Sequence, residues 1–240
     1  MSENKTVIVT GASQGIGAAI VQALLDRQYN VVANSRSISK SILNPSATLA
    51  LVDGDIAYIA TAEKVAKTAV SEFGSIDHLV NNAGIYAAKH FTNYTVDDLS
   101  GFVSTNLNGF VFVTQLAVKQ MLAQGGGGSV TTITAALADN PIAGAPSSVP
   151  MITKGGLNTV TRSLAIEYAR KHIRFNAVAP GVVNTPMHEN HPKDFLKSLA
   201  PMSTISETQD VADAVVYLME ARYVTGEVLH VDGGAHIGRW

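Results

Sequence analysis

The chain has 240 residues, of which 46% are hydrophobic and 15% charged, and its formal net charge at pH 7 is -2. This length and apolar content are enough for one large domain, or two small ones, with a sizeable buried core. The near-neutral charge excludes a basic surface for nucleic acid or an anionic membrane, and the lack of cysteine excludes disulfides, zinc–thiolate sites and thiol nucleophiles.

The N-terminal sequence MSENKTVIVTG runs directly into an apolar strand, without the basic start and apolar core of a signal peptide. No uncharged apolar run reaches the roughly 18 residues that a membrane span needs. We therefore expect a cytoplasmic globular protein with neither nucleic acid nor membrane among its partners.

Short β-branched runs alternate along the chain with longer helix-like stretches. Nearly continuous apolarity in the short runs is typical of strands that are buried on both faces of a parallel sheet. The expected strands are 5–10, 30–35, 47–54, 77–82, 128–134, 173–180 and 227–234, and the expected helices are about 15–28, 61–73, 96–122, 151–170 and 207–219. This alternation predicts an α/β fold with a doubly wound, Rossmann-type parallel sheet of about seven strands. The run GGGG at 125–128 is short and precedes another strand, so we interpret it as a loop within one domain of residues 1–240.

A glycine-rich segment, TGASQGIG at 10–17, follows the first strand and opens a helix. Glycines at such a turn remove the Cβ atoms where a pyrophosphate approaches backbone N–H groups, and the helix N-terminus favours its negative charge. The position in a β–α–β unit therefore predicts a dinucleotide site, although the pattern alone also fits a plain tight turn.

Several ordered motifs, spread over essentially the whole chain, resemble those of the short-chain dehydrogenase/reductase family. TGASQGIG is similar to the family's TGxxxGxG loop, NNAG (81–84) to its motif after strand four, and NLNG (106–109) to the segment with its active-site asparagine. APGVVNTPM (179–187) resembles its proline–glycine turn with a nicotinamide-contacting threonine, and VTGEVLHVDGG (224–234) its last strand.

The resemblance implies a set of cofactor contacts. The pyrophosphate would be lined by the first loop, the adenine side by the ends of strands three and four, and the nicotinamide end by the turn after strand six. NNAG also fits a role in supporting the centre of the sheet. The implied residues are Gly11, Ser13, Gln14, Gly15, Ile16, Gly17, Asp55, Ile56, Asn82, Ala83, Gly84, Lys154, Pro180, Gly181, Val183 and Thr185.

The preferred cofactor is predicted from the end of strand two. An acidic residue there would bind the ribose 2′-hydroxyl and repel a 2′-phosphate. The chain has Ser35 followed by Arg36, and a hydroxyl next to a guanidinium suits a phosphate. NADP(H) is therefore favoured over NAD(H), although Gln14 stands where NADP-preferring relatives often carry a second basic residue.

The catalytic positions depart from the family pattern. The resemblance implies hydride transfer between nicotinamide and a carbonyl, with a tyrosine as acid or base, a lysine beside it, a serine and an asparagine. Lys154 and Asn106 match the lysine and the asparagine, but Pro150 stands at the tyrosine position and Ala135 at the serine position. If no insertion is assumed, the serine position becomes Leu137.

Three side chains are candidates for the missing proton donor. Burial beside a cationic nicotinamide would lower the pKa of Lys154, so that this lysine itself donates a proton or only grips the ribose. Tyr86 follows NNAG and also fits an aromatic that merely lines the pocket. His188 lies on the expected substrate lid, about 186–206, where His188 and His191 are interpreted as solvated and no metal site is predicted.

Two functions from different classes follow. The first is an NADP(H)-preferring oxidoreductase that acts on a small carbonyl, alcohol or activated C=C substrate with an altered proton donor. The second is a non-catalytic NADP-binding protein with a role in regulation or assembly. The helices at 96–122 and 151–170 resemble those that pair across the family's two-fold axis, so a homo-oligomer, tetramer or dimer, is expected.

Overall fold

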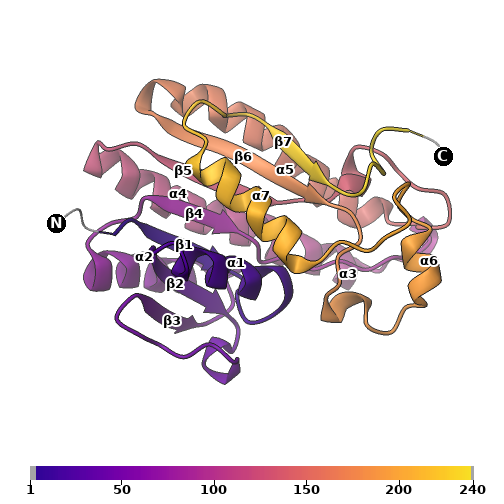
Figure 1. The fold of residues 1–240 in the computed structure, drawn as a ribbon, viewed down its shortest axis with the longest axis horizontal. Helices are drawn as coiled ribbons and strands as arrows, with labels where there is room; N and C mark the ends of the chain where they lie inside the picture. The colour runs from indigo at the N-terminus through magenta and orange to yellow at the C-terminus, as the bar shows by residue number, and fades with distance from the viewer. Residues whose placement is uncertain (1–3, 239–240) are drawn as a thin grey trace.

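The computed structural model, which describes residues 4–238, contains a seven-stranded parallel sheet (Figure 1). Its order is β3-β2-β1-β4-β5-β6-β7, with β3 and β7 at the two edges. The strands are β1 (Thr6–Thr10), β2 (Asn30–Ser35), β3 (Leu49–Asp53), β4 (His78–Asn81), β5 (Gly128–Ile133), β6 (Ile173–Pro180) and β7 (Val228–Val231). The order reverses between β1 and β4, which creates a crevice at their carboxyl ends where open α/β sheets bind ligands. The Rossmann-type fold expected from the sequence is confirmed.

Helices cover both faces of the sheet, which makes three layers (Figure 1). One face carries α1 (Gly15–Leu25) and α7 (Thr208–Glu220), and the other carries α2 (Ile59–Phe73), α4 (Gly109–Gln124) and α5 (Ser148–Tyr168). Because side chains alternate along a strand, β1 supplies Val7 and Val9 to the first core and Ile8 to the second. All three are fully buried, as the apolar run predicted.

The range 96–122 is helical throughout, as expected, but it is not one uniform α-helix. The chain forms α3 (Val96–Phe102), then a π-helical stretch at Val103–Asn108, and then α4. A π turn holds an extra residue, and such turns are frequent at functional sites. Gly109 follows at once, where an added Cβ would lie 2.9 Å from Cγ2 of Ile56, so only a glycine lets α4 approach so closely.

The start of α5 differs slightly from the range expected from the sequence. The helix begins at Ser148, three residues before the expected start, and Pro150 lies in its first turn, where a proline costs no backbone hydrogen bond. Ser147 occupies the N-cap, but its hydroxyl donates to the carbonyl oxygen of Ala145 at 3.0 Å and caps nothing. The helix therefore begins without a side-chain cap.

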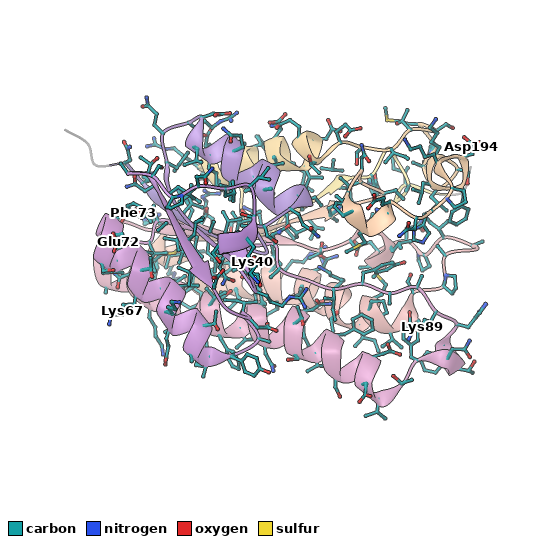
Figure 2. The ribbon with its side chains drawn as sticks, turned by 90° about the horizontal axis from the view of Figure 1, so that it is seen from below. Lys40, Lys67, Glu72, Phe73, Lys89 and Asp194 are labelled. Carbon is teal, nitrogen blue, oxygen red and sulfur yellow. The ribbon has the colours of Figure 1, made fainter. Side chains whose placement is uncertain are left out.

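The two ends of the sheet are easily distinguished in Figure 2. Lys67, Glu72 and Phe73, in the second half of α2, lie toward the end of the molecule opposite to Lys89 and Asp194. Asp194 belongs to the short helix α6 (Lys193–Lys197), which the sequence did not predict. The segment after β4 and the expected lid thus flank the same end, which is the carboxyl end of the strands. Among residues 4–238, no helix has both the length and the apolar character that crossing a bilayer requires.

Candidate functional site

The glycine-rich turn after β1 has the backbone that its sequence requires. Gly11 and Gly15 have φ angles of +66° and +56°, in the left-handed region that glycine enters at least cost. A Cβ on Gly17 would overlap the carbonyl oxygen of Gly11. Gln14 is the N-cap of α1 and makes no side-chain cap bond, so the helix presents free N–H groups beside Ser13 and Ile16. This turn is a cradle for an anion.

The NNAG segment supports this turn from below. The side-chain amide of Asn82 donates to the carbonyl oxygens of Thr10 and Gly11 at 3.1 and 2.9 Å. The backbone N–H of Ala83 donates to Oγ1 of Thr10 at 3.0 Å. A Cβ on Gly11 would lie only 2.8 Å from Cα of Ala83. The supporting role considered for NNAG is therefore present in the structure.

At the end of β2, Ser35 has a buried hydroxyl without a hydrogen-bond partner among the described residues, and Arg36 is exposed. The strand register places Asp53 opposite Ser35, and the sequence reasoning missed this acid. Its carboxylate accepts bonds from N–H and Oγ of Ser39 at 2.9 and 2.6 Å, which lower its pKa. Both carboxylate oxygens of Asp53 are therefore bonded within its own neighbourhood, to Ser39. Its position opposite Ser35 follows only from the pairing of β2 with β3.

Asp55 and Ile56, expected on the adenine side, lie directly after β3. Oδ1 of Asp55 accepts the backbone N–H of Ala57 at 3.0 Å, which orders the loop. Ile56 is buried against Gly109, at the beginning of α4. This side of the crevice is therefore joined to the helix that follows the π turn.

The segment after β6 closes over the glycine-rich turn. Pro180 ends β6, and the N–H of Gly181 donates to the carbonyl oxygen of Val231 at 3.0 Å. Val183 is buried and forms a bridge with Ser206. Cγ2 of Thr185 is 3.3 Å from where a Cβ on Gly15 would be. Two segments that lie 170 residues apart in the sequence, at positions 15 and 185, thus face each other across the crevice.

Lys154 lies in α5 with only 8% of its surface exposed. Its Nζ donates to the carbonyl oxygen of Ile133, at the end of β5, at 2.9 Å. A Cβ on Gly84 would lie 3.0 Å from this Nζ and 3.3 Å from Oδ1 of Asn106. Burial of the ammonium group lowers the pKa of Lys154 to about 8. The lysine and the asparagine singled out in the sequence thus meet beside Gly84.

Asn106 is located in the π-helical stretch, and its amide is fully engaged. Oδ1 accepts the N–H of Ile85 at 2.8 Å, and Nδ2 donates to the carbonyl oxygen of Ile85 at 3.1 Å. Nδ2 also donates to Oγ1 of Thr153 at 3.0 Å, and Thr153 donates to the carbonyl oxygen of Pro150 at 2.8 Å. Asn106 therefore ties the segment after NNAG to the turn of α5 that carries Lys154.

Neither position expected for the family's serine and tyrosine carries a hydroxyl. Ala135 follows β5, Leu137 lies in the next 3₁₀ turn, and Pro150 is buried. Nearby, Oγ1 of Thr134 already donates to the carbonyl oxygen of Val178 at 3.3 Å. Half-buried Tyr86 has a pKa raised by burial, which the Ser147 hydroxyl partly offsets.

The expected lid borders a cavity of about 390 Å³, which the sequence did not reveal. Nδ1 of His188 lies 2.9 Å from the carbonyl oxygen of Val183, and the rings of His188 and His191 meet edge to face with centroids 6.0 Å apart. Within residues 4–238, no group of three or more histidine, cysteine, aspartate or glutamate side chains is arranged to hold a metal ion, here or elsewhere. The cavity is lined by Asn184, Thr185, Pro186, His188, Glu189, His191, Lys193, Leu196 and Ile205.

Known proteins resemble the chain over nearly its full length. Residues 11–236 match the family described as Enoyl-(Acyl carrier protein) reductase. The L-rhamnose 1-dehydrogenase (NAD(P)(+)) of Azotobacter vinelandii is 36% identical, over 98% of this chain and 97% of its own. The 3-oxoacyl-[acyl-carrier-protein] reductase of Mus musculus is 33% identical, over 98% of this chain and 99% of its own.

Solved structures agree with this assignment. The 3-ketoacyl-(acyl-carrier-protein) reductase of Brucella melitensis, complexed with NADH, superposes with a TM-score of 0.90 at 27% identity and covers 98% of this chain and 99% of its own. ElxO with NADP bound gives a TM-score of 0.89 at 27% identity, with 98% and 100% covered. Fold, motifs and relatives lead to one conclusion: the chain belongs to the short-chain dehydrogenase/reductase family of NAD(P)-dependent oxidoreductases.

Proposed function

We propose that the chain is an NADP(H)-preferring oxidoreductase that reduces or forms a small carbonyl compound, or reduces an activated C=C bond, with Lys154 as its proton donor. The observation that carries this proposal is the position of Lys154, which lies buried beside Gly84 and Asn106 with a pKa of about 8. General acids work best when their pKa lies near the working pH. An ordinary lysine is too weak an acid for this role, and burial brings this one into range.

The crevice fits a dinucleotide cofactor. The glycine-rich turn leaves a space that Cβ atoms would fill, and the N-terminus of α1 offers N–H groups to a pyrophosphate. Ser35 brings a buried hydroxyl without a partner, and Arg36 an exposed guanidinium that suits a 2′-phosphate. When bound, the cofactor supplies or accepts the hydride.

The remaining cofactor contacts are proposed on the same basis. The glycine-rich turn would hold the pyrophosphate, the loops after β3 and β4 the adenosine, and the segment after β6 the nicotinamide end. Apart from Ser35 and Arg36, the proposed contacts are Gly11, Ser13, Gln14, Gly15, Ile16, Gly17, Asp55, Ile56, Asn82, Ala83, Gly84, Lys154, Pro180, Gly181, Val183 and Thr185.

In the proposed reaction the chain's own groups handle the proton. One N–H of the Lys154 ammonium is held by the carbonyl oxygen of Ile133, which leaves two for the substrate oxygen or a ribose hydroxyl. Asn106 bonds both Ile85 and Thr153, the residue directly before this lysine. General acid catalysis contributes about 10²- to 10⁴-fold in rate, so a lysine that replaces the tyrosine keeps useful activity.

The test is single-turnover oxidation of NADPH against pH, with a panel of aldehydes, ketones and enones. The unmodified protein should lose rate as the pH rises through about 8, because Lys154 loses its proton there. Lys154→Met should slow transfer by about 10²-fold or more and abolish this titration. An unchanged rate and pH profile in Lys154→Met would show that the lysine only holds the ribose, and Tyr86→Phe and His188→Gln would then be measured to find the donor.

A second candidate function rests on a separate observation. Ala135 and Pro150 place no hydroxyl where the family's serine and tyrosine would contact a carbonyl oxygen. A protein that binds NADP(H) for regulation or assembly would not need these hydroxyls. This candidate would be favoured if calorimetry shows that NADPH binds but no compound of the panel supports its oxidation.

A further inference from the structure

A chain of polar side chains joins α5 to β7 and the C-terminal turn. We name the set Asp139, Asn158, His230, His236 and Asp232 the clasp. Nδ2 of Asn158 lies 3.3 and 3.2 Å from the two carboxylate oxygens of Asp139. Nε2 of His230 lies 3.0 Å from Oδ2 of the same aspartate. One carboxylate thus bridges α5 and β7.

The clasp continues from His230 into the C-terminal turn. The rings of His230 and His236 stack with centroids 3.8 Å apart and planes 14° apart. Nδ1 of His236 lies 2.9 Å from Oδ2 of Asp232, whose side chain is almost fully buried. A Cβ on Gly181 would lie 2.9 Å from Cα of Asp232, so the clasp ends directly against the turn after β6.

Two further hydrogen bonds show that the same turn contacts the neighbouring segments. Nδ2 of Asn140 donates to the carbonyl oxygen of Ala235 at 2.8 Å, which ties down the loop after β5. The N–H of Met202 donates to the carbonyl oxygen of Gly233 at 3.2 Å, at the end of the expected lid. The clasp therefore lies where the turn after β6, the loop after β5 and the end of the expected lid meet.

The link to Lys154 is through helix geometry. Asn158 follows Lys154 by four residues, so the two side chains lie one above the other on the same face of α5. Asn158 is 2% exposed, and its only partner among the described residues is Asp139, since its Oδ1 makes no hydrogen bond. Loss of the aspartate would leave the whole buried amide unpaired, which favours a shift of this face of α5 toward water.

We propose that Asp139 is a positioning residue that, together with His230, holds the Lys154-bearing face of α5 against the sheet and keeps the lysine dry. This role rests on the proposed function, because it concerns the same lysine, but it can be measured without any turnover. Within residues 4–238, Asp139 makes no hydrogen bond to Lys154 or to any residue assigned above to the cofactor.

The first measurement is the titration of Lys154 by ¹³C NMR, in protein labelled at lysine Cε and with the resonance assigned by Lys154→Arg. Burial alone lowers the pKa of this lysine to about 8. In Asp139→Ala, water reaches the ammonium, and the midpoint should rise by half a unit or more toward the ordinary lysine value of about 10.4. Asp139→Asn should restore the midpoint, because the amide oxygen still accepts from Asn158 and His230 can present its other tautomer.

The second measurement is single-turnover NADPH oxidation. Asp139→Ala should slow hydride transfer about tenfold while the Kd for NADPH changes less than threefold, because misplaced groups cost rate before they cost binding. The matched control is Asp77→Asn, which removes a carboxylate that binds the N–H of Thr6 at 2.8 Å at the opposite end of the sheet. It should change neither the Lys154 midpoint nor the rate.

The outcomes separate the two proposals. An Lys154 midpoint in Asp139→Ala equal to that of the unmodified protein overturns the positioning role, as does an equal shift in Asp77→Asn. If none of the tested substrates supports NADPH oxidation by the unmodified protein, the proposed function fails. The Lys154 titration alone then still decides the role of the clasp.

Discussion

At the scale of single residues, Arg36 carries the expected cofactor preference. Its exposed guanidinium follows Ser35, and the nearest acid along the register, Asp53, is held by Ser39. NADPH should bind more tightly than NADH by about tenfold or more, since a charge-assisted contact is worth about 1.5–3 kcal/mol. Arg36→Ala should remove most of this difference, and calorimetry of both cofactors measures it. Equal affinities in the unmodified protein would refute the preference; Lys40→Ala, on a neighbouring exposed lysine, is the control.

A second residue, His78, makes stability depend on pH. It is buried at the beginning of β4, with Nδ1 2.8 Å from Oγ of Ser129 and its ring edge-on to Tyr29. Burial, reinforced by the charge of Lys5, lowers its pKa from 6.5 to about 4. Between about pH 6.5 and 4 the unfolded chain therefore binds a proton at this histidine and the folded chain does not. The contribution of His78 to stability is complete above pH 6.5 and is lost as the pH falls toward 4.

Between pH 7.5 and 5.0 this group should cost about 2 kcal/mol of the free energy of unfolding, at about 1.4 kcal/mol per pKa unit. Urea denaturation at both pH values measures it. His78→Gln, which keeps a polar partner for Ser129, should lose less stability over the same interval. If the two proteins lose the same free energy of unfolding, His78 is protonated as readily in the folded chain as in the unfolded chain, and its pKa is not lowered.

Individual site residues differ in how far the sequence predicts their surroundings. Lys154, Asn106 and Gly84 were picked from separate motifs, and the structure brings them together because parallel strands end at one edge of the sheet. Asp53 and the clasp were missed. Both depend on pairings between segments far apart in the chain, which no local pattern encodes.

At the scale of elements, the strands were predicted to within about three residues, because apolar β-branched runs between turns have few other solutions. Helix interiors were also predicted well. The π-helical stretch at Val103–Asn108 was not, since its apolar pattern continues that of the neighbouring helices and its cause is the tertiary bonding of Asn106. Ser147 is a residue type that caps helices, but its hydroxyl donates to the carbonyl oxygen of Ala145, two residues earlier, instead.

At the scale of the whole molecule, α4 and α5 present apolar side chains to solvent. Val111 and Leu122 of α4 are 39% and 40% exposed, and Ile152 and Ile166 of α5 are 62% and 83% exposed. Exposed apolar side chains of this kind are typical of a surface that pairs with a second copy about a two-fold axis. We therefore expect a dimer or tetramer.

Light scattering should return two or four times the chain mass of 25.2 kDa. Ile166→Glu should shift the population toward smaller species, because it buries an unpaired charge in the paired face. Ile42→Glu is the matched control, since Ile42 is 87% exposed but lies after β2, away from these helices. A mass near that of one chain for the unmodified protein would contradict the assembly.

The π turn makes the length of the chain matter at one place more than at most others. Because it holds one residue more than an α turn would, the side chains of α3 and α4 are out of phase by about 100° relative to one continuous helix. Deletion of a single residue within Val103–Asn108 would bring the two parts back into phase and would turn either Phe102 out of the core or Asn106 away from Ile85. An exposed loop such as the one at Gly125 and Gly126, where an added Cβ would meet nothing within 4 Å, absorbs the same loss easily. Among relatives of this chain, insertions and deletions should therefore be common in the loop at Gly125 and Gly126 and rare within Val103–Asn108.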